Sequence, residues 1–175
     1  VVGDILHMGL AGYGVARKDL STGEILSPLT ASNRGGLLPS DQIYALDTDG
    51  FNLYIGTQQG ARKWDGNQMT SFGQGSSWQT RPSQFFDFAI ESSISGGTLY
   101  AGTNIGVCKY SIATMGIDDC LNVYDGMPNW ATYAVGVNST TVFGGTFSGV
   151  GLIDKSSFTI DGEWEATSST SDAIV

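Results

Sequence analysis

The stretch Leu53-Tyr54-Ile55-Gly56-Thr57-Gln58-Gln59-Gly60 decides the fold, because versions of it recur along the chain. The other copies are Leu99-Tyr100-Ala101-Gly102-Thr103-Asn104-Ile105-Gly106, Val142-Phe143-Gly144-Gly145-Thr146-Phe147-Ser148-Gly149 and a degraded Leu6-His7-Met8-Gly9-Leu10-Ala11-Gly12. They recur at intervals of roughly 45 residues, a period typical of propeller blades and solenoid turns. The chain is therefore predicted to consist of about four similar units.

A single unit contains four short strand patterns. In the second unit they cover 42–46, 52–55, 60–64 and 68–72, with turns at Asp49-Gly50 and Asp65-Gly66-Asn67. Four short antiparallel strands make one propeller blade. The predicted fold is all-β, a β-propeller of about four four-stranded antiparallel blades, either complete or part of a larger ring.

The 175 residues suit a single β-propeller domain or propeller fragment. The approximate blades are 1–30, 31–77, 78–125 and 126–170, with 171–175 starting or closing a blade. Residues 171–175 resemble the start of an inner strand that the first blade lacks. Two arrangements are possible. Residues 171–175 could complete the first blade and close a four-bladed ring, or the chain could be a half-ring that pairs with another copy or with missing blades. We favour the half-ring, completed either by a second copy in a homodimer or by missing blades, because four blades strain the wedge geometry.

Charge and hydropathy exclude two classes of partner. The chain has 17 acidic and 8 basic residues, a net charge of −9, which repels phosphate backbones and argues against nucleic acid. Its apolar runs are too short for membrane insertion.

Two cysteines, Cys108 and Cys120, could face each other across a hairpin and form a disulfide, which would imply an oxidising compartment. The alternative is two reduced, buried thiols. Together with the sequon Asn138-Ser139-Thr140, the cysteines favour an exported protein, extracellular or periplasmic.

No residue set predicts catalysis. The lone His7 occupies the column where other units carry Tyr54, Tyr100 and Phe143, which indicates a packed ring rather than a catalytic base or metal ligand. Asp47-Thr48-Asp49-Gly50 has some likeness to a calcium loop but sits where each blade needs a turn. The prediction is therefore no enzyme, no metal site and no cofactor.

One part of the chain consists of Gly36-Leu37-Leu38-Pro39, an Asp-Gly turn and then residues 53–64. This pattern resembles the two-component regulator propeller repeat. This repeat is found in extracytoplasmic sensor regions of bacterial hybrid kinases and in surface proteins. The resemblance extends through 82–110 and 126–153, with Leu10 and Leu152 departing from the pattern. It implies a propeller used for sensing or binding and carries over no catalytic residues.

The connections between blades break the repeat most. Loops held by a rigid scaffold commonly carry function, and two of these connections contain tryptophan beside polar side chains. We hypothesise a ligand site for carbohydrate or another small polar ligand at Trp78, Arg81, Asn129 and Trp130. The alternatives are that both rings merely cover the blade ends, that the chain is a protein-protein interaction or surface-assembly module, and that it is a fragment of a propeller enzyme whose active site lies in missing blades.

Overall fold

The computed structural model describes residues 1–32, 38–93 and 96–165. Their strands form one three-stranded and three four-stranded antiparallel sheets, in which each strand pairs with its neighbours in sequence. Sheet 1 contains β1 (Ile5–Leu10), β2 (Gly14–Asp19) and β3 (Ile25–Leu29), and sheet 2 contains β4 (Ile43–Thr48), β5 (Leu53–Thr57), β6 (Gly60–Trp64) and β7 (Met69–Ser71). Sheet 3 contains β8 (Phe85–Ser93), β9 (Gly96–Thr103), β10 (Gly106–Ser111) and β11 (Ile117–Leu121), and sheet 4 contains β12 (Thr132–Val137), β13 (Thr141–Thr146), β14 (Gly149–Asp154) and β15 (Thr159–Glu165).

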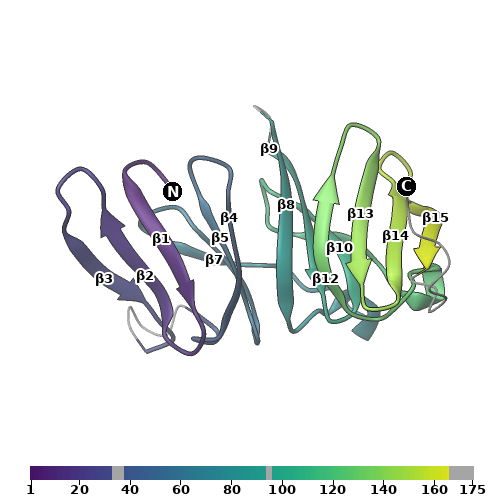
Figure 1. Cartoon of the computed structure of the whole chain (residues 1–175), viewed down its shortest axis with the longest axis horizontal. Helices are drawn as coiled ribbons and strands as arrows, with labels where there is room; N and C mark the ends of the chain where they lie inside the picture. The colour runs from purple at the N-terminus through teal and green to yellow at the C-terminus, as the bar shows by residue number, and fades with distance from the viewer. Residues whose placement is uncertain (33–37, 94–95, 166–175) are drawn as a thin grey trace, which may run out of the picture.

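The sheets stand side by side in a row, with sheet 1 at one end and sheet 4 at the other (Figure 1). Strands β4, β8 and β12 pack against one another, so they form the inner edge of the row. The propeller-type architecture predicted from the repeat is confirmed. Within the described residues the row is open. The proposed closing segment 171–175 lies outside them, as do Gly36 and Leu37 of the repeat pattern.

Three apolar cores lie between neighbouring sheets. The core between sheets 2 and 3 includes Tyr54, Phe85 and Tyr110, and the core between sheets 3 and 4 includes Tyr100 and Val142. A third core joins sheets 1 and 2. Since each core takes side chains from both faces that it joins, every sheet needs a neighbour on each side to bury its apolar residues.

The repeated Gly-Thr pair has a structural explanation. A Cβ atom at Gly56 would lie 2.8 Å from the backbone oxygen of Phe85, and one at Gly102 would lie 2.8 Å from that of Thr132. Both oxygens belong to the inner strand of the next sheet. Glycine is therefore required where one sheet approaches the backbone of the next.

The threonine that follows each of these glycines stabilises the tight turn between the second and third strands. Thr57 Oγ1 donates to the Gly60 carbonyl at 2.8 Å and accepts from Gln59 N at 3.1 Å. Thr103 and Thr146 make the same pair of bonds in sheets 3 and 4. The motif thus serves packing and turn formation.

His7 is a half-buried ring in β1, as its column predicts, and its Nδ1 atom is buried with no hydrogen-bond partner among the described residues. Burial lowers the pKa of His7, and the nearby charge of Arg17 lowers it further. Folding therefore favours the neutral form of this imidazole.

We expect stability to fall as the pH drops below about 6.5, because the unfolded chain then binds a proton at His7 that the folded chain does not bind. Replacing His7→Phe should reduce this loss between pH 7.5 and pH 5.5. Urea unfolding of both proteins at the two pH values measures the difference. An identical pH dependence in the two proteins would contradict the expectation.

Candidate functional site

The structure brings Trp78 and Trp130 together, although they lie in different connections between sheets. Their ring centroids are 5.7 Å apart. The ring of Tyr124 completes the group, 6.1 Å from Trp78 and 5.2 Å from Trp130, and it is perpendicular or nearly so to both. All three rings are exposed, by 56%, 37% and 68% for Trp78, Trp130 and Tyr124. We call Trp78, Tyr124 and Trp130 the aromatic cluster.

Two short 3-10 helices hold the cluster in place. Trp78 begins η2 (Trp78–Thr80), and the connection that carries η2 is closed by a hydrogen bond from Gly75 N to the Thr80 carbonyl at 2.6 Å. The same connection is tied by Gln74 Nε2, which donates to the Pro82 carbonyl at 3.4 Å. Helix η2 packs on β11, the outer strand of sheet 3.

Tyr124 lies in η3 (Val123–Asp125), which directly follows β11. Asn122 and Asp125 form a capping box around its first turn: Asn122 Oδ1 accepts from Tyr124 N, and Asp125 Oδ2 accepts from Asn122 N, each at 2.9 Å. Gly126, with a φ of 104°, ends the helix in a left-handed conformation. This local order fixes the direction in which Tyr124 projects.

A polar hollow of about 150 Å³ is built from the same segments as the cluster. Its lining residues come from η2, β11 and η3: Ser77, Gln79, Thr80, Asp119, Cys120, Asn122 and Asp125. Residues Ser77 and Gln79 flank Trp78 in sequence, and Asp125 follows Tyr124. The hollow and the aromatic cluster thus share the segments η2 and η3, although none of the three rings lines the hollow itself.

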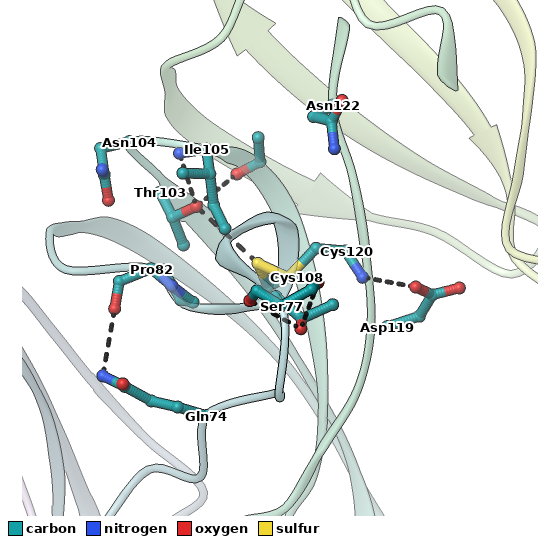
Figure 2. The surroundings of a disulfide bond; sticks show 12 residues. Gln74, Ser77, Pro82, Thr103, Asn104, Ile105, Cys108, Asp119, Cys120 and Asn122 are labelled. Atoms are coloured by element: carbon teal, nitrogen blue, oxygen red, sulfur yellow. Dashed lines mark hydrogen bonds between the residues drawn. A yellow bond between two sulfur atoms is a disulfide. The ribbon is translucent and has the colours of Figure 1, made fainter. Parts of the chain in front are cut away.

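The disulfide predicted between Cys108 and Cys120 is formed, with Cα atoms 4.0 Å apart. The two residues are register partners on β10 and β11, so the bond ties the outer strand to the rest of sheet 3. In Figure 2 the connection from Gln74 to Pro82 passes over the disulfide, and Ser77 lies beside it. The bond thus anchors the wall of the hollow.

The other two residues of the sequence hypothesis are placed differently. Asn129 precedes Trp130 but donates through Nδ2 to Ser148 Oγ at 2.9 Å, which ties it to the turn between β13 and β14. Arg81 directly follows η2 and is exposed. Neither residue lines the hollow.

Sequence reasoning missed Tyr124 and the polar groups of the hollow. Asp119 is an exposed acid of the edge strand β11, and nothing in its sequence context indicates that it lines the hollow. The Asn-x-x-Asp spacing of residues 122–125 was the available signal, because it is typical of a helix start.

A second row of rings lines the inner edge of the sheets. Tyr44, Phe86 and Tyr133 each occupy the extra residue of a β-bulge in β4, β8 and β12. Bulges re-aim a side chain, and here consecutive centroids lie 5.5 Å and 4.9 Å apart, with Phe147 a further 4.3 Å from Tyr133. We call these four residues the inner strip.

Two charged side chains outside the candidate site, Asp49 and Lys109, have structural partners. Asp49 accepts hydrogen bonds from Phe51 N, Asn52 N and the Tyr54 hydroxyl at 2.7–2.9 Å, as expected for a turn. Lys109 lies 5.5 Å from the ring centroid of Phe158. Across the described ranges, no group of three or more His, Cys, Asp or Glu residues is arranged to hold a metal ion.

No helix within the described part of the chain has the length and apolar character needed to span a membrane.

Comparison with solved structures places the fold among large propeller-type proteins. The chain is similar to the extracellular domain of the hybrid two component system BT4673 from B. thetaiotaomicron, with 19% identity and a TM-score of 0.70 over 95% of this chain and 22% of that one. It is similar to the corresponding domain of BT3049 from the same organism, with 14% identity and a TM-score of 0.67 over 90% and 21%.

The third structure is Kuenenia stuttgartiensis hydrazine synthase, with 14% identity and a TM-score of 0.64 over 92% of this chain and 46% of that one. No protein-family model and no curated protein matches the chain. The chain therefore spans about a fifth of the two-component domains and less than half of the synthase. At these identities the comparisons show the fold, which is the fold that the repeat implies.

Proposed function

We propose that this chain is a non-catalytic binding or sensing module that recognises carbohydrate or another small polar ligand in an extracellular or periplasmic space. The observation that carries the proposal is the packing of three exposed rings, Trp78, Tyr124 and Trp130, beside a polar hollow. Flat rings offer apolar surface to the faces of sugar rings, while nearby polar groups bond to hydroxyls. The formed disulfide supports the compartment, because disulfides persist in oxidising environments.

Binding to a glycan panel tests the proposal. We expect Trp78→Ala and Trp130→Ala each to weaken binding of the best glycan about tenfold or more, which corresponds to about 1.4 kcal/mol. Tyr13→Ala is a matched control, because Tyr13 is 77% exposed and lies in a turn of sheet 1. Unchanged binding in both tryptophan variants, or no binding of any glycan by the unaltered protein, would contradict the proposal.

A second candidate function is assembly with another copy of the chain, and the two end sheets favour it. Strand β5 of sheet 2 is buried throughout, whereas β13 of sheet 4 is only partly buried and β1 of sheet 1 is partly exposed. Met8 is 44% exposed, while Ile55, the equivalent residue of sheet 2, is fully buried. Among the described residues, the face of sheet 4 that carries Phe143 and the face of sheet 1 that carries Met8 thus both lack the neighbouring sheet that the middle sheets have.

Two copies related by a two-fold axis could join sheet 4 of each to sheet 1 of the other and close a larger ring. Such a dimer would have twice the 18.4 kDa mass of the chain. We expect light scattering to give that mass and Met8→Glu to reduce it to that of one chain, with Tyr13→Glu as the control. A folded, unaltered protein with the mass of one chain would contradict this assembly.

A further inference from the structure

The charge of the hollow narrows the ligand class, and this inference rests on the proposed function. Two carboxylates, Asp119 and Asp125, line the hollow, and no lysine or arginine does. Lys109 is the register partner of Asp119, but its ammonium lies over the ring of Phe158. Neither carboxylate forms an ion pair within the described residues. The ion pair found there joins Lys155 and Glu91. The hollow therefore presents uncompensated negative charge beside the aromatic cluster.

Each carboxylate keeps an oxygen for a ligand. Asp119 Oδ1 accepts from Cys120 N at 2.8 Å, and Asp125 Oδ2 accepts from Asn122 N at 2.9 Å. The second oxygen of each has no hydrogen-bond partner among the described residues. Both carboxylates can therefore accept a further hydrogen bond.

Asn122 adds an amide donor to the hollow. This residue is only 1% exposed, and it lines the hollow. Its Oδ1 is used by the helix cap, but its Nδ2 donates to no residue in the described part of the chain. Nδ2 therefore keeps its capacity to donate a hydrogen bond in the hollow. The amide is placed to donate to a hydroxyl of the ligand.

The size of the hollow decides how a ligand would lie. Its volume of about 150 Å³ is smaller than that of a typical ligand pocket, roughly 300–1,000 Å³. It can admit one substituent of a sugar, while the ring itself rests on the exposed aromatic cluster. The substituent that meets two carboxylates is best matched by a cation, because charge-assisted hydrogen bonds are stronger than neutral ones.

We propose that the module recognises a saccharide that carries a protonated amine, with the ring on the aromatic cluster and the ammonium bound by Asp119 and Asp125. Neutral and N-acetylated sugars lack the charge that both carboxylates attract. Uronic acids bring a negative charge that the hollow repels. The amine thus sets the preference among sugars that can all stack on the same rings.

Calorimetry with three hexasaccharides tests this inference: fully deacetylated glucosamine, fully N-acetylated glucosamine and galacturonate. At pH 6 and low salt we expect the amine form to bind at least tenfold more tightly than the N-acetylated form, and galacturonate to bind most weakly. The preference should shrink as salt is added, because salt screens exposed charges. Asp119→Asn combined with Asp125→Asn should abolish the preference, since both amides keep the shape and the capping oxygen but lose the charge.

Asp118→Asn is the matched control, because Asp118 is an exposed acid of the same strand that does not line the hollow. An amine preference that survives in the double variant, or that Asp118→Asn removes equally, would overturn the inference in favour of general attraction to an acidic protein. Equal binding of the amine and N-acetylated forms through Trp78 and Trp130 would overturn this inference but leave the proposed function intact. Failure of all three saccharides to bind would overturn this inference, and the glycan panel would then decide the proposed function separately.

Discussion

Replacing Cys108 and Cys120 together with alanine should lower the free energy of unfolding by about 3 kcal/mol. The two residues are 12 apart in sequence, so the disulfide closes a short loop and restricts the unfolded chain by about that amount in the chain-entropy model. Both side chains are buried in the core between sheets 2 and 3, so the alanines also remove buried sulfur atoms. Denaturant unfolding with a fitted slope measures the loss.

A reducing agent provides the control for this prediction. The unaltered protein, once its disulfide is reduced, should unfold at nearly the same denaturant concentration as the double-alanine variant. The variant itself should not respond to the reductant. A variant that is as stable as the oxidised protein would show that the disulfide does not stabilise the sheet.

Loss of the disulfide should also affect the hollow. Cys120 lines it, and β11 carries Asp119 and leads directly into η3 with Tyr124. Because β11 is the outermost strand of sheet 3, it has a strand neighbour on one side only. We therefore expect saccharide binding to weaken in the alanine variant even under conditions where it stays folded.

The repeated motif explains why the architecture could be predicted from sequence. The strand predicted at 60–64 matches β6 residue for residue. Gly60 marks its start, and the Asp65-Gly66 turn marks its end. The strand predicted at 52–55 was too short, since β5 continues through Gly56 and Thr57. Both residues lie beyond the predicted limit, and Thr57 is still paired with Ile43 of β4.

The bulges were not predictable from one strand alone. Tyr44, Phe86 and Tyr133 occupy the same place in three inner strands, but a bulge is defined by the register with the partner strand. The inner strip arises from the contact of these rings across three sheets, which no local pattern encodes.

The candidate site could be predicted only in part, because some of its contacts join distant segments of the chain. The tryptophans stood out because they interrupt the repeat, and the structure places their rings in contact. Tyr124 follows the last strand of sheet 3, and its ring meets Trp78 because η2 folds back onto β11. Such a contact between segments about forty residues apart depends on packing rather than on any local pattern.

The glycines of the repeat give the second large expected effect. Gly102→Ala should destabilise the protein by about 3 kcal/mol, because its Cβ would lie 2.8 Å from the Thr132 carbonyl oxygen. The obstacle is backbone of sheet 4, so relief requires β12 to shift as a whole and opens the core between sheets 3 and 4. Thermal and denaturant unfolding of the variant measure the loss.

Gly145→Ala is the matched control, because Gly145 is the equivalent residue of sheet 4. Within the described ranges a Cβ there meets only Ala134 of its own sheet, at 3.4 Å, so we expect the free energy of unfolding to change by less than about 0.5 kcal/mol. If a second copy packs on this face, as the assembly candidate requires, its backbone should approach Gly145 as Thr132 approaches Gly102. Gly145→Ala would then leave the fold intact and weaken the dimer. The free energy of unfolding reports the glycine's role within the chain, and the mass in solution reports its role between chains, so both measurements on this one variant separate the two roles.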